Sequence, residues 1–184
     1  MASKFRGRVN IDVDLTEWFD SVLERGAIHY PLAMNLTLAN GTSAGQIDLA
    51  YGKRESGIGA SVTTVYDLAG TLADKSGTTI TFVEVVLIAL LNRSATAANY
   101  LLMGPDATNG FGVVASNVGF WADASDRNAF AADYNSSDGD GSWGVLNCRT
   151  GVAVGAGSTD ELAVITQGGT SANTWDIIIG GRSA

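Results

Sequence analysis

The sequence has few of the residues that build covalent links, metal sites and acid–base centres. Its 184 residues include one cysteine, Cys148, and one histidine, His29. A single cysteine excludes an internal disulfide bond and the cysteine-rich zinc sites. A single histidine excludes a metal site of the usual histidine-rich kind, so we interpret His29 as a packed or hydrogen-bonded structural residue. The fold must therefore be stabilised by core packing.

Proline and charged side chains are also scarce. Only 2 prolines accompany 23 glycines, which indicates many tight turns. The net charge is −8, and the 11 lysine and arginine residues are spread along the chain, whereas phosphate binding needs clustered basic residues. We therefore expect no direct nucleic-acid binding and no attachment to a membrane. The first residues, MASKFRGRVNIDV, carry positive charge but lack the apolar segment of a signal peptide.

The main hydrophobic run is too short to cross a membrane. Residues 82–91 are apolar apart from Glu84, whereas a membrane-spanning helix needs about 20 such residues. Many residues from Thr78 to Ile88 are β-branched, and turn-forming residues flank the run on both sides. This pattern predicts a strand over 79–92, central in its sheet and bent near Ala89, with Glu84 at the rim or at a subunit interface. A buried helix is the alternative.

The N-terminal residues differ from the rest of the chain. Apolar residues first alternate over 9–13 and then follow a helical spacing from Asp14, which is a suitable N-cap, to Gly26, which is a suitable C-terminal residue. We predict an N-terminal arm and one short amphipathic helix within residues 1–32. The helical stripe packs either on its own sheet or on a neighbouring subunit. It consists of Leu15, Trp18, Phe19, Val22 and Leu23.

Residues 33–184 show short strand-like segments with turn residues about every ten positions. Eight or nine such strands without alternating helices are typical of a β-sandwich or a small barrel. We therefore predict an all-β protein, with a β-sandwich or jelly-roll-like domain over 33–184. No repeat or linker divides this region.

Two segments resemble functional motifs without completing them. Residues 41–45, GTSAG, match the nucleophile-elbow pattern, but a strand-like segment follows them and the only histidine lies upstream. A hydrolase would need Ser43 and His29 within hydrogen-bond reach. Residues 133–144 are rich in Asp and Asn, yet the EF-hand positions for Gly and Glu are wrong, so incidental calcium binding in the 133–141 loop stays open. We predict no enzyme activity, no cofactor and no metal site.

Three stretches carry a resemblance to a known kind of protein: NLTLANGTSAGQIDLAYGKR (35–54), YDLAGTLADKSGTTITFVEVVLIALLNRS (66–94) and STDELAVITQGGTSANTWDIIIGGRSA (158–184). Together they resemble small β-sandwich structural proteins of tailed-phage virions, of the kind that act as head decoration or cement proteins. The resemblance implies a homotrimer on the capsid exterior, made in the host cytoplasm, that binds the major capsid protein and ties neighbouring subunits together.

The arm is the expected contact with the capsid or with a neighbouring copy. Its basic residues would meet an acidic capsid surface, and its apolar stripe would dock. The expected interface residues are Lys4, Arg6, Arg8, Trp18, Phe19, Val22 and Leu23.

A tail or fibre component that binds a receptor or a glycan is the alternative. In that case Trp121, Tyr134 and Trp143 would be exposed on one surface and would stack on sugar rings.

Overall fold

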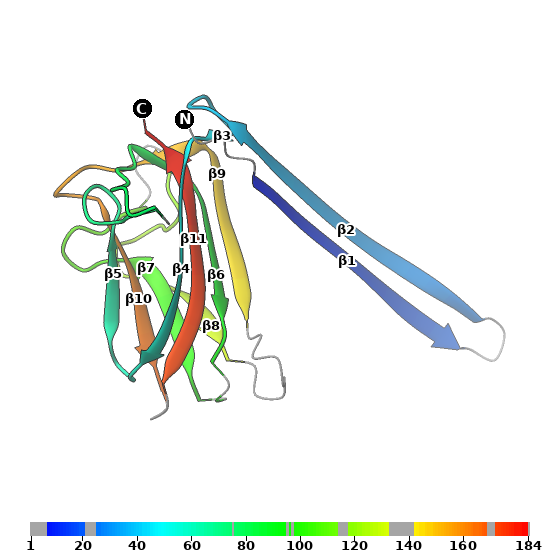
Figure 1. Ribbon diagram of the computed structural model, residues 1–184. Coiled ribbons are helices and arrows are strands. Elements are labelled where there is room, and N and C mark those ends of the chain that lie inside the picture. Colours follow the sequence, from blue (N-terminus) through cyan, green and yellow to red (C-terminus); the bar gives the residue numbers. More distant parts are fainter. Residues whose placement is uncertain are drawn as a thin grey trace.

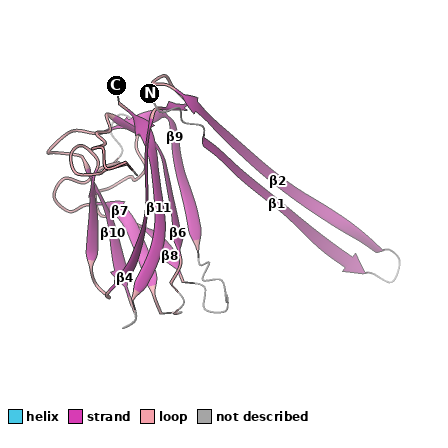
Figure 2. Cartoon of the chain, viewed as in Figure 1, coloured by secondary structure: helices cyan, strands magenta, loops and turns pink. Residues whose placement is uncertain are grey.

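The computed structural model describes residues 7–20, 25–74, 76–94, 96, 98–113, 118–132, 142–168 and 172–183, with side chains from Leu36 onward. Every regular element in these ranges is a strand (Figure 2). The strands are β1 (Gly7–Asp20), β2 (Arg25–Asn40), β3 (Gln46–Ile47), β4 (Leu49–Ile58), β5 (Thr63–Asp67), β6 (Glu84–Asn92), β7 (Tyr100–Pro105), β8 (Asn128–Ala131), β9 (Trp143–Ala153), β10 (Glu161–Gln167) and β11 (Asn173–Arg182).

Two antiparallel four-stranded sheets form a sandwich, as predicted (Figure 1). One sheet has the order β5-β10-β7-β8 and the other has the order β4-β11-β6-β9. Strands far apart in the sequence pair in a nested pattern, because β4 pairs with β11, β5 with β10, β6 with β9 and β7 with β8. The chain from β4 to β11 is therefore one long antiparallel hairpin that is rolled into two layers.

Strand alternation places the core between the two sheets. In β11, Trp175, Ile177 and Ile179 are buried, whereas Ile178 between them is 52% exposed. Leu162 and Val164 of β10 are buried from the opposite sheet and belong to the same apolar cluster. A period of two along a strand assigns successive side chains to opposite faces, so β11 has one core face and one outer face.

The hydrophobic run at 82–91 is largely the central strand β6, as predicted. The strand begins at Glu84 rather than Thr79, and β11 and β9 pair with its two sides. The pairing is irregular at Val86, not near Ala89. This β-bulge makes two consecutive residues, Val86 and Leu87, face away from the main core, while Val85 on one side of them belongs to it. At the bulge, both faces of β6 are therefore covered.

The predicted N-terminal helix is wrong in the described residues. Residues 14–20 belong to β1 and residues 25–26 begin β2, while 21–24, with Val22 and Leu23, lie outside the described residues. Leu15 and Phe19 are four apart, a spacing that keeps two residues on one face in a helix and also in a strand. The pairing with β2 decides between them, because it gives every second residue of β1 a hydrogen-bonded partner along the whole strand.

The expected boundary between the arm at 1–32 and the domain at 33–184 falls inside β2, which continues from Arg25 to Asn40. The strands of the sandwich begin later, at Leu49 in β4.

A buried hydrogen bond joins the two sheets. The indole Nε1 of Trp175 in β11 donates to the hydroxyl oxygen of Tyr66 in β5 at 3.0 Å, and burial raises the pKa of the Tyr66 hydroxyl. We expect Tyr66→Phe to lower the free energy of unfolding by about 1–3 kcal/mol, because it leaves a buried indole donor without a partner. Tyr100→Phe, at a residue that is 41% exposed, is the matched control. Urea unfolding of both variants measures the effect, and equal midpoints for the two would contradict it.

Candidate functional site

β1 and β2 form a two-stranded ribbon that projects away from the sandwich (Figure 1). The pairing runs without a break from Gly7 opposite Leu38 to Asp20 opposite Arg25. At about 3.3 Å per residue, these 14 residues of β1 give a ribbon roughly 45 Å long. A two-stranded hairpin alone is marginally stable in water, so this ribbon needs a surface to pack against.

The register sorts the ribbon residues into an apolar series and a polar series. Two residues that pair across the strands form a row, and their side chains share one face of the ribbon. Every second row along the ribbon lies on that same face. One series of rows, which we call the apolar face, is Val9 with Leu36, Ile11 with Met34, Val13 with Leu32, and Leu15 with Tyr30. The rows between them, which we call the polar face, are Arg8 with Thr37, Asn10 with Asn35, Asp12 with Ala33, Asp14 with Pro31, and Thr16 with His29.

The root of the ribbon packs on the sandwich through its apolar face. Leu38 is two positions from Leu36 and so continues the same series. It is buried in a second apolar cluster with Ile47 of β3 and with Val86 and Leu87 of β6, and Leu36 packs against this cluster. We call these residues the root cluster. The cluster lies on the side of β6 that is opposite the main core, so the ribbon starts from the outer face of the β4-β11-β6-β9 sheet.

Backbone hydrogen bonds fix the turn between the ribbon and the sandwich. The Gly45 N–H donates to the Arg149 carbonyl of β9 at 2.9 Å, and the Gly41 N–H donates to the Ile47 carbonyl at 3.1 Å. Both glycines have positive φ, and β3 pairs with β2 in parallel. A turn follows Asn40, but the parallel pairing of β2 with β3 means that it does not close a simple hairpin.

The outer face of this sheet stays apolar beyond the root cluster. Ile178 of β11 is 52% exposed, and Trp143 of β9 is 56% exposed. Between them, Ala89 and Leu91 of β6 and Val145 of β9 are partly exposed. The register places them on one face, because Ile178 pairs with Ala89, Ala89 pairs with Val145, and Leu91 pairs with Trp143. We call this group the outer patch.

An ion cluster borders the outer patch. Asp176 accepts hydrogen bonds from Arg54 Nε at 2.7 Å and from Arg54 Nη2 at 2.8 Å, and Arg93 Nε donates to the same carboxylate. These bonds, with those from Arg54 the largest contribution, lower the pKa of Asp176 from 3.8 to about 2. The cluster links β4, β11 and the residue that follows β6. The ion cluster therefore stabilises the packing of these three chain segments against one another.

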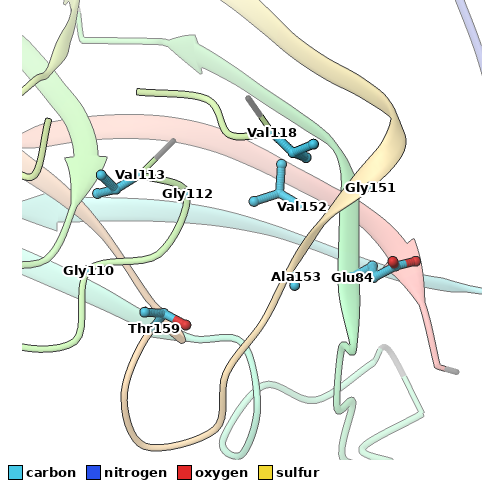
Figure 3. A pocket seen from close by; sticks show the side chains of 9 residues that line it. All are labelled: Glu84, Gly110, Gly112, Val113, Val118, Gly151, Val152, Ala153 and Thr159. Carbon is cyan, nitrogen blue, oxygen red and sulfur yellow. The ribbon is translucent and has the colours of Figure 1, made fainter. Parts of the chain in front are cut away.

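A cavity of about 270 Å³ opens at the other end of β6, and valines and glycines form much of its lining (Figure 3). Its only carboxylate among the described lining residues is that of Glu84, which is directed toward the end of β11. There it forms an ion pair with Arg182 at 2.5 Å, and the Arg182 side chain is only 3% exposed. Arg182 also donates to the Thr150 carbonyl. Glu84 thus balances the charge of the buried Arg182 guanidinium. It lies at the rim of the sheet, which is one of the two positions predicted for Glu84.

The two residues of the hydrolase hypothesis are not brought together. Ser43 is exposed in the turn after β2, where its N–H donates to the Gln46 side chain at 3.1 Å. His29 lies in β2 opposite Thr16, ten residues before Ala39 at the root. Ten residues of extended strand span roughly 33 Å. The GTSAG segment connects two strands and does not turn into a helix, so it lacks the geometry of a nucleophile elbow.

The structure separates the predicted interface residues. Arg8 belongs to the polar face, and Trp18 lies opposite Ala27 in a further row of the same alternate series, whereas Phe19 belongs to the alternate series of Leu15. Trp18 and Phe19 therefore cannot form one stripe. Lys4, Arg6, Val22 and Leu23 lie outside the described residues.

Two other predicted groups have mixed outcomes. Trp121, expected to be exposed in a glycan-binding protein, is 4% exposed in the main core, while Trp143 is exposed. Tyr134 and the 133–141 loop lie outside the described residues. Within the residues that the structure describes, no group of three or more His, Cys, Asp or Glu side chains could hold a metal ion.

Sequence reasoning missed the root cluster and the outer patch. A signal for both was present. The alternation in NLTLAN at 35–40 continues the apolar series of the ribbon, and in the run of three isoleucines at 177–179 the middle residue must face away from its neighbours.

Comparison with known proteins finds no family model that matches the chain and no similar curated protein or solved structure. Among the described residues, no helix has the length and apolar character needed to span a membrane.

The ion cluster makes stability depend on pH in acid. At neutral pH we expect Asp176→Asn to lower the free energy of unfolding by roughly 1 kcal/mol, because the pair is partly exposed and screened. The native pKa is lowered, so the stabilisation is present above about pH 4 and is lost as the pH falls toward 2. The difference between the two proteins should therefore shrink over this range.

Urea unfolding at about pH 7, 4 and 2 measures this difference. Arg54→Gln is the companion variant, since Arg54 makes the largest contribution to the pKa of Asp176, and it should reproduce most of the effect. A stability difference that stays constant from neutral pH to pH 2 would show that the carboxylate has an ordinary pKa.

Proposed function

We propose that this protein is a structural component of a tailed-phage virion, a decoration or cement protein that forms a homo-oligomer and binds the major capsid protein on the capsid exterior. The observation that carries the proposal is the ribbon with one apolar face, which projects from a compact β-sandwich. Such an element has no stable place on an isolated chain and fits a protein that works in an assembly. The resemblance of residues 35–54, 66–94 and 158–184 to phage decoration proteins supports the same function.

The strand pairing gives further support. Eight strands that pair as one rolled hairpin have the arrangement of a jelly roll, an architecture used by viral capsid proteins and by lectins. Fold alone does not assign a function, so this support is one of analogy. The ribbon is what favours the virion over a free lectin, because a projecting arm with one apolar face suits contact with another protein more than contact with a sugar.

Charge and multivalency fit the same proposal. A net charge of −8 favours solubility of the free protein before it binds the capsid. Repeated weak contacts on a lattice add up to firm attachment, so a weak contact from each copy is sufficient to tie neighbouring capsid subunits together. Glycan binding has less support, because Trp121, one of the three aromatic residues that it would use, lies in the core.

The test uses the purified full-length chain and capsids assembled from the major capsid protein of the same phage. We expect saturable co-sedimentation at a fixed ratio and a higher disruption temperature for the decorated capsids, because each copy bridges neighbouring subunits. Capsids already saturated with the protein are the control for nonspecific pelleting. A chain that stays in the supernatant at all concentrations, or that pellets only with tail structures, would refute the proposal of a cement protein.

A further inference from the structure

The chain has two apolar surfaces that its own fold does not bring together. One is the apolar face of the ribbon, from Val9 to Leu15 on β1 with their partners on β2. The other is the outer patch, where Ile178 and Trp143 are more than half exposed. Figure 1 shows that the ribbon diverges from the sandwich beyond its root, so the distance between the ribbon and the sheet increases toward the tip of the ribbon. A projecting strand pair with apolar rows and an exposed apolar patch are both typical of interaction sites.

We propose that the ribbon of one copy packs with its apolar face on the outer patch of a second copy of this chain. The structure already contains this kind of contact within one chain. In the root cluster, Leu36 and Leu38 of the ribbon pack on Val86 and Leu87 of the same sheet. The outer patch continues from these residues across the same sheet face, since Ala89 and Leu91 follow Leu87 at alternate positions. The proposed interface therefore extends an existing one from the root to a neighbour.

A second copy fits better than other occupants because one contact covers both surfaces. If two ribbons packed on each other, Ile178 and Trp143 would stay exposed on every copy. If a capsid protein covered the ribbon, the outer patch would need a further partner. Exchange between copies buries both surfaces and requires no additional chemistry, since each surface is apolar and each is present once per chain.

The apolar face of the ribbon sets the size of this contact. From Val9 to Leu15 it covers seven residues of β1, or roughly 23 Å, and at about 10 Å wide it offers roughly 230 Å². With the receiving sheet, one contact therefore buries about 460 Å², which is less than a standard protein interface. Each copy gives one ribbon and receives another, so two such contacts hold each copy in a closed ring.

The contact is heterologous, because a ribbon meets a sheet and not a second ribbon. Heterologous contacts generate a closed ring when the rotation between copies closes, and an open filament when it does not. Only the expected number of three copies in the ring rests on the proposed function. The exchange itself concerns free protein in solution and does not need the capsid.

Two pairs of matched full-length variants test the exchange. Val13→Asn with Leu15→Asn alters the apolar face, and Asp14→Asn with Thr16→Asn places the same residues on neighbouring rows of the polar face. On the receiving side, Ile178→Asn alters the outer patch. Val65→Asn alters a valine that is 44% exposed on the opposite sheet. Molar mass is measured by light scattering, and urea unfolding shows that the sandwich of each variant remains folded.

We expect the wild type and both control variants to be oligomeric, with masses that are integral multiples of the chain mass. The apolar-face variant and Ile178→Asn should each be monomeric, because each lacks one half of every contact. An equimolar mixture of these two monomers should form a dimer that stops at two chains, because one copy supplies an intact ribbon and the other supplies an intact sheet.

Three results would overturn the inference. A monomeric wild type would show that the surfaces do not meet in solution. An oligomer of Ile178→Asn with the wild-type mass would assign the ribbons to each other. Two folded monomers that do not combine would exclude the exchange between copies. Capsid binding is scored separately, so a stable ring that ignores capsids would refute the proposed function and leave this inference intact.

Discussion

The outward packing of Val86 and Leu87 is the contact on which the arrangement of the whole chain depends. A strand in the middle of a sandwich has one core face, and its other face is ordinarily exposed. The bulge in β6 instead makes two consecutive large residues face outward. Burial of such side chains stabilises a fold by about 1.5–3 kcal/mol each, so covering them is strongly favoured. Leu38 and Ile47 provide the cover, and they attach β2 and β3 to the sheet.

The root cluster also determines which side of the ribbon is apolar. Since Leu38 contacts the sheet, every second residue back along β2 belongs to the same series, through Leu36, Met34 and Leu32. Their partners on β1 are apolar as well, and the residues between them are largely polar or charged. A shift of the register by one residue would place polar residues opposite the apolar series, so the pattern fixes the pairing.

The sandwich could be predicted from the sequence because its strands carry their own signal. Alternation, glycine-rich turns and the β-branched run at 79–92 predicted an all-β fold and a central strand. The bulge at Val86 could not be predicted, because the run is apolar at every position after Glu84 and therefore shows no period. The nested pairing of β4 with β11 depends on contacts between residues far apart in the chain, which no local pattern encodes.

The N-terminal error has a different physical origin. Leu15 and Phe19 fit a helix and a strand equally well, and Trp18 seemed to complete a helical stripe. The alternation at 9–13 already indicated a strand, but a strand needs a partner, and the matching alternation lies in residues 28–38. Only the comparison of these two segments in antiparallel register shows that apolar rows and polar rows coincide. Leu36, Leu38 and Ile178 were missed for the same reason, since the place of each depends on a neighbouring strand.

The ribbon has an apolar face that favours packing and a polar face whose acidic residues repel other acidic surfaces. Beyond the short pairing with β3, the described residues of the ribbon pair with no further strand, and a ribbon of this length could pair with other strands without specificity. Asp12 and Asp14 on the polar face place negative charge along β1, in a chain whose net charge is −8. Two ribbons stacked with polar faces together would bring like charges close, whereas the apolar face carries no such penalty. The outer patch is bordered by the Asp176 cluster, in which two guanidinium groups offset one carboxylate. The charges therefore disfavour stacking of two ribbons through their polar faces and leave the apolar face as the one suited to packing.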